Sequence, residues 1–506
     1  MSKKYDKKCK ILVIGLDGAT WNILNNLIGE LYNLRKLISE GCYGKLESCL
    51  PPTTFPAWKC YSTGKNPGKL GVYWWLNLDV QTKTVIMNNS KSFKSMEIWD
   101  YLSNMGFKCG VIGMPTTYPP KEINGFLVSE FNPSNSKFTY PEYLADILKK
   151  KFNYIAKFED YHGKNREIIA NLYTNLIEQR FKATKYLISK FNVDFLNVVI
   201  FHIDGIQHFY WKYMEQNDKR FGDVIRATWK LIDEKLGELI DNFCPNYVFI
   251  ISDHGFTSLK GMFNLLIWLL GKRYTFLKGK FLSFLGKTKL LPYIARVSKF
   301  FLKHFISGVN DFTTISMNSL DWKKSKVIPF GEGLLYINEK AFSSKSEIEN
   351  FCEKLIHELM EVKDPLRGEP ILMRVFNRHE IYNGKYVNKA PHLILLANEG
   401  YEIRNAGLSK KLWDFHPKEE GWSATHTPYG IFIAHGKDIK KNQKLKNIRI
   451  YDIAPTILHI YGLPIPNDMD GRVLMEIFEP GSEISKRRPI YVQPLYYSLQ
   501  RIKRKG

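Results

Sequence analysis

The chain has 506 residues, of which 44% are hydrophobic and 24% are charged, a composition typical of a large globular protein. Lys and Arg outnumber Asp and Glu by 73 to 50, and the formal net charge of +23 favours an anionic partner such as a nucleic acid, a phosphorylated metabolite or a lipid headgroup. The seven cysteines include no CxxC pair, which argues against a cysteine zinc site or a disulfide framework. No apolar run approaches the ~18 residues that span a membrane, so we expect a cytoplasmic protein.

The predicted elements alternate between short apolar strands and long amphipathic helices. In chain order, the predicted strands are ILVIGL, CGVIGM, FLNVVIF, YVFIIS, LILL and YGIFIA. The predicted helices cover residues 21–40, 97–105, 166–190 and 221–243, with a closing helix in YDIAPTILHIYGL. Helices of this length between strands indicate βαβ units and a largely parallel sheet, which places the chain in the α/β class.

One segment departs from this alternation. Residues 255–310 contain ten Lys and Arg but no Asp or Glu, and residues 294–305 combine a basic with an apolar helical face. We therefore expect a discontinuous core with two inserted lids and a tail. The expected parts are the core at 1–258 and 388–490, a basic amphipathic lid insertion at 259–320, a second small lid at 321–387 and a basic C-terminal tail at 491–506.

The basic segment at 259–310 has two interpretations. A lid helix would pack its apolar face on the core and display its lysines to water. Alternatively, a basic amphipathic helix binds anionic lipid, which would place the protein at the inner face of the membrane. The charge comes without a recognised DNA- or RNA-binding motif, so we expect no specific nucleic-acid partner.

Six side chains suited to metal binding lie at the ends of predicted strands or in the adjoining loops. Three carboxylates and three imidazoles suit two divalent cations, because zinc accepts both oxygen and nitrogen ligands in four-coordinate sites. We expect Zn²⁺, with Mn²⁺ as the alternative. The residues are Asp17, Asp204, His208, Asp253, His254 and His426.

Each of these residues also has a structural interpretation when taken alone. Asp17 could cap the following helix, and Asp253 could hydrogen-bond its own backbone in the SDHG turn. Asp204 and His208 could be a cap and a partly buried histidine, although their i, i+4 spacing puts both on one helical face. The joint occurrence at four strand ends favours the metal site.

A pair of hydroxyl groups supplies a candidate nucleophile. Thr53 and Thr54 precede Phe-Pro in the stretch LPPTTFPAWK, and metal coordination is a standard way to activate such a group. Taken alone, the stretch is better explained as a turn that opens a helix with Thr as its cap. The sequence contains no Gly-x-Ser-x-Gly elbow, no P-loop and no dinucleotide-binding glycine fingerprint.

The order of these motifs resembles the alkaline phosphatase superfamily. The similarity is greatest to the type I phosphodiesterase/nucleotide pyrophosphatase family, in a prokaryotic branch of predicted phosphohydrolases and phosphomutases. It extends along the chain through LDGATW, TGKNPGKLGVYWW, GMPTTYPP, SDHGF and APHLIL. The resemblance implies a three-layer α/β/α sandwich with a mostly parallel central sheet and inserted lid segments.

The resemblance also implies roles for the site residues. One metal would be held by Asp204, His208 and His426, and the other by Asp17, Asp253, His254 and the nucleophile. Thr54 is the better match for that nucleophile, because it directly precedes Phe-Pro.

The chain departs from the family pattern at one position. Ala57 stands where the nucleotide pyrophosphatases carry a phosphate-binding Asn. The expected replacements are a backbone N–H near Phe55, or the side chain of Lys59 or Lys65.

The implied activity is hydrolysis of a phosphorylated, anionic substrate through a phospho-threonine intermediate and two divalent cations. The alternatives within the superfamily are a phosphomutase and a phospho-headgroup transferase, which could act at a membrane surface.

Overall fold

The computed structural model describes residues 9–131, 136–157, 165–278, 317–405, 411–415 and 421–505. The chain forms two compact units. The first comprises Met1–Leu70, Asn88–Thr257 and Glu419–Gly506, and the second comprises Gly71–Met87 and Ser258–Lys418. Residues 71–87 and 388–418, which the sequence placed in the core, therefore cluster with the second unit. The predicted amphipathic face at 294–305 lies outside the described residues.

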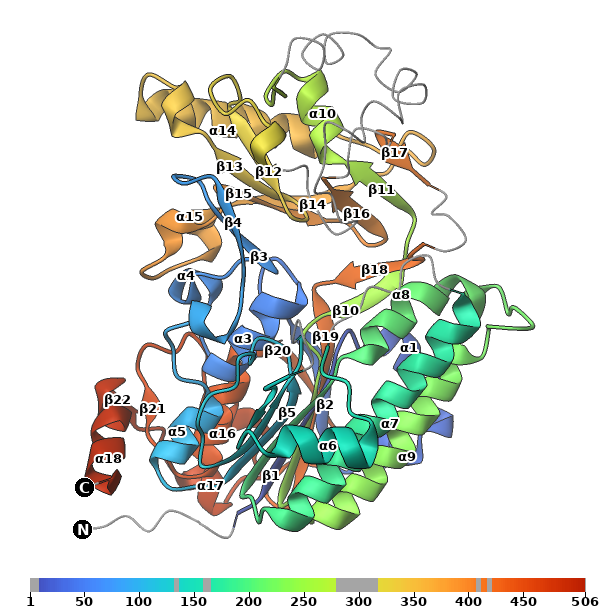
Figure 1. The fold of residues 1–506 in the computed structure, drawn as a ribbon, viewed down its shortest axis with the longest axis vertical. Coiled ribbons are helices and arrows are strands. Elements are labelled where there is room, and N and C mark those ends of the chain that lie inside the picture. The colour runs from blue at the N-terminus through green and yellow to red at the C-terminus, as the bar shows by residue number, and fades with distance from the viewer. Residues whose placement is uncertain are drawn as a thin grey trace. The chain divides into compact units, whose positions relative to one another are not determined.

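A nine-stranded sheet forms the centre of the first unit (Figure 1). The five neighbours β9, β1, β8, β5 and β6 run parallel to one another, whereas β19 runs antiparallel to both β9 and β2. The mostly parallel sheet expected for the α/β class is thus confirmed. In spatial order, the strands are β20 (Gln443–Arg449), β2 (Cys42–Glu47), β19 (Tyr429–Gly436), β9 (Tyr247–Ile251), β1 (Ile11–Leu16), β8 (Phe195–Ile200), β5 (Cys109–Met114), β6 (Gly125–Ser129) and β7 (Thr139–Tyr140).

Helices cover both faces of this sheet (Figure 1). Every residue of β1, β8 and β9 is buried, as a strand with helices on both sides requires. On one face lie α1 (Trp21–Leu27), α2 (Tyr32–Ser39), α6 (Leu144–Phe152), α7 (Arg166–Lys190), α8 (His202–Glu215) and α9 (Val224–Phe243). On the other lie α3 (Thr54–Thr63), α5 (Ile98–Asn104) and α16 (Ile453–Ile460), with α18 (Leu495–Lys505) packed on α5.

Short elements complete the first unit. The strands β10 and β18 form a separate two-stranded sheet, and β21 pairs with β22 in parallel. These elements are α4 (Pro67–Leu70), α17 (Glu483–Lys486), β10 (Gly255–Ser258), β18 (Ala424–Thr427), β21 (Ile465–Pro466) and β22 (Tyr491–Val492).

The second unit has its own sheets and its own hydrophobic core. The predicted strand LILL is β15 (Leu393–Ala397), and it pairs antiparallel with β13 and β14 instead of joining the nine-stranded sheet. The helices are α10 (Leu265–Gly271), α14 (Lys345–Met360) and α15 (Arg378–Ile381). The other strands are β3 (Leu76–Asp79), β4 (Thr84–Met87), β11 (Gly261–Asn264), β12 (Val327–Phe330), β13 (Leu334–Ile337), β14 (Leu372–Asn377), β16 (Tyr401–Arg404) and β17 (Trp413–Asp414). No helix among the described residues of either unit is long and apolar enough to cross a membrane.

A buried carboxylate on α9 caps the distant helix α2. Leu31, the N-cap residue of α2, offers no side-chain acceptor, so the first N–H groups of that helix need another partner. Asp233 accepts hydrogen bonds from the backbone N–H groups of Asn33 (3.0 Å) and Leu34 (2.7 Å). Gly237 permits this approach, because a Cβ there would lie 2.6 Å from the Asn33 amide. The contact fixes α2 against α9.

Replacing this cap should destabilise the protein. Asp233→Ala leaves one buried and one partly buried N–H group unpaired, and we expect a loss of about 1–3 kcal/mol in the free energy of unfolding. Urea titration followed by circular dichroism measures this loss. Glu234→Ala is the matched control on the same helix, because the Glu234 side chain is 64% exposed and pairs with Lys235; it should cost less than about 0.5 kcal/mol. Equal losses for the two variants would contradict the capping role.

Candidate metal centre

The strand order brings the predicted ligands to one edge of the sheet. The carboxyl ends of the parallel neighbours β9, β1 and β8 lie side by side. Asp17 follows β1 directly, Asp204 lies in the first turn of α8 after β8, and Asp253 follows β9. His426, in β18, precedes β19, whose start lies at this same edge because β19 runs antiparallel to β9. Four segments that are far apart in the sequence therefore meet at one place, where ligands bind in open α/β sheets.

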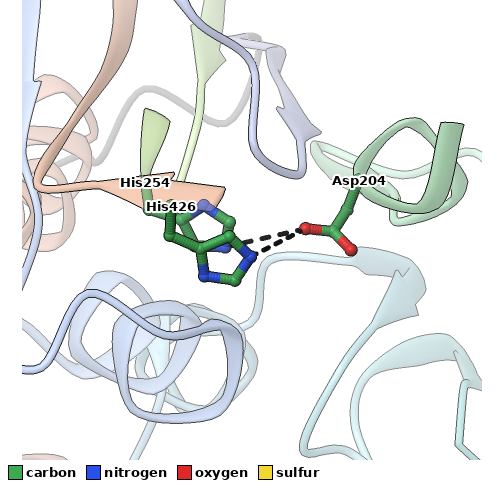
Figure 2. A group of neighbouring side chains, drawn as sticks. All are labelled: Asp204, His254 and His426. Atoms are coloured by element: carbon green, nitrogen blue, oxygen red, sulfur yellow. Dashed lines mark ion pairs between the residues drawn. The ribbon is translucent and has the colours of Figure 1, made fainter. Parts of the chain in front are cut away.

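Two groups of side chains there are close enough to hold a metal ion each. In either group the ligand atoms lie within 4.8 Å of one another. The groups are Asp204, His254 and His426, and Asp17, Asp253 and His254. Figure 2 shows the first group, in which both imidazoles face the Asp204 carboxylate. His254 belongs to both groups, so the two candidate sites adjoin each other.

Both histidines of the first group approach the Asp204 carboxylate. His426 Nε2 lies 3.3 Å from Asp204 Oδ1, and His254 Nε2 lies 4.0 Å from the same oxygen. The imidazoles of His254 and His426 stack with their centroids 3.7 Å apart. This stacking orients both rings toward one carboxylate.

His208 borders the first group from the next turn of α8. Its Nε2 lies 3.6 Å from Asp204 Oδ2 and 3.1 Å from His426 Nε2. Its Nδ1 lies 2.9 Å from the carbonyl oxygen of Ala424. Because a carbonyl only accepts, Nδ1 carries the proton and the lone pair of Nε2 faces the cluster. Trp422 stacks on the ring at 3.8 Å and holds this orientation.

Asp17 and Asp253 meet across the turn that follows β1. Asp253 Oδ1 accepts a hydrogen bond from the Gly18 N–H (3.1 Å), and Asp17 Oδ2 accepts one from Trp58 Nε1 (2.7 Å). The other oxygens face His254 Nε2, Asp253 Oδ2 at 3.2 Å and Asp17 Oδ1 at 3.5 Å. The expectation that Asp17 might cap α1 is wrong, because Thr20 is the N-cap and accepts from the Asn22 N–H. Both carboxylates are thus oriented with one free oxygen inward.

The inward-facing atoms have no hydrogen-bond partner among the described residues, although they are buried. These atoms are Asp17 Oδ1, Asp204 Oδ1, Asp253 Oδ2 and His254 Nε2. Buried polar atoms are almost always paired, and carboxylate oxygen with imidazole nitrogen is a donor set that zinc accepts. The residues present therefore fit divalent cations, which would hold these atoms together.

Burial and mutual repulsion perturb the carboxylates. Burial, together with the charges of Asp253 and Asp204, raises the pKa of Asp17 well above its usual value. Burial likewise raises the pKa of Asp253 to about 7. At Asp204 burial acts in the same direction, but the neighbouring histidines, His208 foremost, lower the pKa to about 2. The pair Asp17 and Asp253 therefore lacks the positive charge that it needs in order to ionise.

The candidate nucleophile lies on a helix that is joined to this edge. Thr54 is buried and begins α3, and Trp58 one turn later donates to Asp17. Residues i and i+4 share a helical face, so Thr54 lies on the face of α3 that meets the end of β1. Thr53 is the N-cap of α3, but its side chain makes no capping bond. Phe55 packs edge-on against Phe131 at 5.5 Å.

The two lysines considered as phosphate ligands are engaged elsewhere. Lys59 Nζ pairs with Glu97 Oε1 at 2.6 Å, in a buried cluster that also holds Lys121. Lys65 Nζ pairs with Asp468 Oδ2 at 2.5 Å. These ion pairs hold both ammonium groups against carboxylates.

The sequence interpretation missed three residues that position the ligands. Trp58 orients Asp17, Trp422 stacks on His208, and Gln207 donates from Nε2 to the Gly18 carbonyl oxygen (2.8 Å). Only the role of Trp58 could have been predicted from the sequence, because this residue follows Thr54 by one helical turn. The other two contacts join segments far apart in the sequence.

Comparison with known proteins identifies the family of the chain. The family model for type I phosphodiesterase/nucleotide pyrophosphatase matches residues 11–429. A search of curated protein sequences found no match.

Solved structures of murine ectonucleotide pyrophosphatase/phosphodiesterase 5 have a similar fold. One is 14% identical with a TM-score of 0.51, and the match covers 93% of this chain and 100% of that chain. An inactive variant in complex with AMP is 15% identical with a TM-score of 0.50, over 90% of this chain and 96% of that chain. At this identity the structures show the fold, and the family match over most of the chain shows the relationship. The chain therefore belongs to the type I phosphodiesterase/nucleotide pyrophosphatase family, whose members are phosphoric ester hydrolases.

Proposed function

We propose that the chain hydrolyses a phosphoric ester with Thr54 as the nucleophile and with two divalent cations in the site. The observation that carries the proposal is the set of four buried ligand atoms without a hydrogen bond at one sheet edge, beside the helix that begins with Thr54. Three buried carboxylates without a cation would be costly. The family match over residues 11–429 gives independent support for the reaction type.

The ligands divide between the two cations by distance. His254 Nε2 lies closer to Asp253 and Asp17 (3.2 and 3.5 Å) than to Asp204 (4.0 Å). We therefore assign His254, Asp17 and Asp253 to one cation, to which the family resemblance adds the Thr54 hydroxyl. The remaining ligands, Asp204, His208 and His426, hold the other. Zn²⁺ fits this mixed nitrogen and oxygen set, and Mn²⁺ is the alternative.

The residues of α3 perform the chemistry in this proposal. Bound cations would supply the positive charge that favours the Thr54 alkoxide and the developing charge on phosphate oxygens. The Thr54 oxygen attacks phosphorus, the bond to the leaving group breaks, and the leaving oxygen takes up a proton. Water then attacks the phospho-threonine and restores Thr54. N–H groups of the first turn of α3 hold a phosphate oxygen, in the place where Ala57 offers no side-chain donor.

The substrate class that we infer is a phosphorylated anion. The net charge of +23 favours such a substrate, and one structure with a similar fold is a complex with AMP. Because Ala57 removes the amide that the nucleotide pyrophosphatases use, we do not assign a nucleotide. A panel of a nitrophenyl monoester, a nitrophenyl diester and a phosphosugar identifies the preferred class, and product analysis separates hydrolysis from mutase or transferase chemistry.

Removing the proposed nucleophile should abolish turnover. We expect Thr54→Ala to lower kcat by at least about 10³-fold on the best substrate of the panel. Thr53→Ala is the matched control at the neighbouring position and should stay within about tenfold of the wild type. Steady-state kinetics on the metal-loaded proteins measures both values. Full activity of Thr54→Ala, or loss of activity in Thr53→Ala alone, would reject the assignment.

Metal binding should stabilise the protein more at higher pH. The raised pKa values of Asp17 and Asp253 mean that the folded, metal-free protein keeps protons that the unfolded chain releases near pH 4. The stability that these two protonated groups contribute is therefore fully present below about pH 4 and is lost as the pH rises through about 7. Added Zn²⁺ replaces the protons, so the increase in Tm on metal addition should grow between about pH 5 and pH 8.

Asp253→Asn is the control for this linkage. The amide retains an oxygen for the Gly18 N–H but cannot ionise. Scanning calorimetry should show a metal-free variant whose Tm depends less on pH and rises less with Zn²⁺. An increase in Tm for the wild type that is independent of pH would contradict the linkage.

The hydrogen bond from the Trp58 indole should increase the metal affinity of the site. Trp58→Phe keeps an aromatic ring but removes the hydrogen bond to Asp17 Oδ2. The loss of such an outer contact typically lowers metal affinity about 10- to 100-fold. Competition with a zinc chelator measures the dissociation constant. Trp99→Phe is the matched control, because the buried Trp99 indole N–H has no partner among the described residues; its metal affinity should not change. Identical affinities for both variants would remove Trp58 from the site.

A further inference from the structure

The C-terminal part of the chain exposes an unusual amount of apolar surface. Residues 490–502 hold five of the fourteen large hydrophobic side chains that are exposed among the described residues. A cluster of this kind marks an interaction site more often than single exposed residues do. The five are Ile490 (46%), Tyr491 (55%), Leu495 (64%), Leu499 (48%) and Ile502 (68%).

Three of these side chains form one stripe along α18. Leu495, Leu499 and Ile502 are spaced i, i+4, i+7, which places them on one face of the helix. The helix is attached to the first unit through a different face, where Tyr497 packs on Tyr101 at 4.8 Å and donates to the Pro464 carbonyl oxygen. The aliphatic face, which a helix normally buries, is therefore the exposed one.

Backbone pairing holds the segment before this helix in place. The Ile465 N–H donates to Ile490 O (2.7 Å), and the Asn467 N–H donates to Val492 O (2.9 Å). The exposed Tyr491 therefore belongs to the paired strand β22, and the exposed Ile490 directly precedes it with its carbonyl oxygen bonded. In the chain, α18 follows this strand after two residues.

The charge of the same segment is entirely positive. Residues 486–506 contain no Asp or Glu and seven Lys or Arg. Lys486 and Arg488 are exposed beside the apolar strand. The other basic residues are Arg487, Arg501, Lys503, Arg504 and Lys505.

We propose that residues 486–505, here called the C-terminal surface, bind an anionic lipid bilayer. A helix with an aliphatic face lies in the bilayer interface with that face among the acyl chains, and basic residues in the same segment add attraction to anionic headgroups. The aliphatic stripe argues for a bilayer over a nucleic acid, and the uniform positive charge argues for anionic lipid over a second copy of this basic chain. The site is separate from the basic segment at 259–310, and the proposal does not depend on the proposed function.

Vesicle co-sedimentation of the full chain tests this surface. Vesicles of phosphatidylcholine mixed with phosphatidylglycerol are compared with vesicles of phosphatidylcholine alone, at low and at high salt. We expect binding to the mixed vesicles at low salt, weaker binding at high salt because the charges are screened, and little binding to phosphatidylcholine alone.

Two variants separate the apolar from the charged contribution. Leu495→Ser/Leu499→Ser/Ile502→Ser should lower the partition coefficient at least about tenfold. Lys503→Gln/Arg504→Gln/Lys505→Gln should lower it on the order of a hundredfold, because each basic residue contributes about fivefold at an anionic surface. The matched control, Ile168→Ser/Leu366→Ser/Met373→Ser, removes three equally exposed apolar side chains elsewhere and should bind within about twofold of the wild type.

Three outcomes would overturn the proposal. The first is wild-type binding by the Leu495, Leu499 and Ile502 variant, and the second is equal binding of the wild type to both kinds of vesicle. The third is a wild-type dimer in sedimentation velocity that this variant dissociates while neither protein binds vesicles, which would make the stripe an interface between copies. Turnover of a soluble nitrophenyl ester should be the same for all variants, so a failure here leaves the proposed function unaffected.

Discussion

Three carboxylates buried at one edge of a sheet are the constraint on which the rest of the site depends. Asp17, Asp204 and Asp253 are each less than a tenth exposed, and ionised carboxylates at such a distance from water destabilise the folded chain unless positive charge is near. At Asp204 the neighbouring imidazoles supply positive charge, and the pKa of this residue is low. At Asp17 and Asp253 the positive charge is insufficient, and their pKa values are high. The excess of negative charge at Asp17 and Asp253 thus marks the place where the proposed cations would bind.

The turn after β1 holds this charge in place. Gly18 has φ of +68°, and a Cβ there would lie 2.4 Å from the Phe256 ring, so only glycine fits. Its N–H donates to Asp253 and its carbonyl oxygen accepts from Gln207. One residue therefore connects the ends of β1 and β9 with α8, and Trp58 connects α3 to the same turn. The backbone of this turn therefore determines the positions of the ligands more than the choice of side-chain rotamer does.

The sequence predicted the local features well and the long-range ones poorly. The helix at 166–190 and the strands that end before Asp17 and Asp253 follow from periodicity and apolar runs, and the structure has them. Asp204 lies instead in the first turn of α8, which follows β8. The family resemblance supplied what periodicity does not contain, namely the order of the ligands and the choice of Thr54 over Thr53.

Two features that local patterns do not contain depend on pairing between distant segments. The strand at 393–397 has the same apolar pattern as a core strand, and only its pairing with β13 and β14 shows that it belongs to the second unit. Lys59 and Lys65 are near Thr54 in sequence, but carboxylates from distant segments determine where their ammonium groups lie. Pairing partners in space are not encoded in local patterns.

The outermost strands of the nine-stranded sheet bear on how the protein behaves at high concentration. An open edge invites another chain to add a strand, which leads to aggregation. At one edge, β20 carries exposed Lys444 and Lys446, a left-handed Asn447 (φ +57°) and a shift in its register with β2. At the other edge, β7 is only two residues long. Both edges are poor templates for the addition of a strand from another chain. The protein can therefore stay dispersed although its central sheet is wide, buried and strongly apolar.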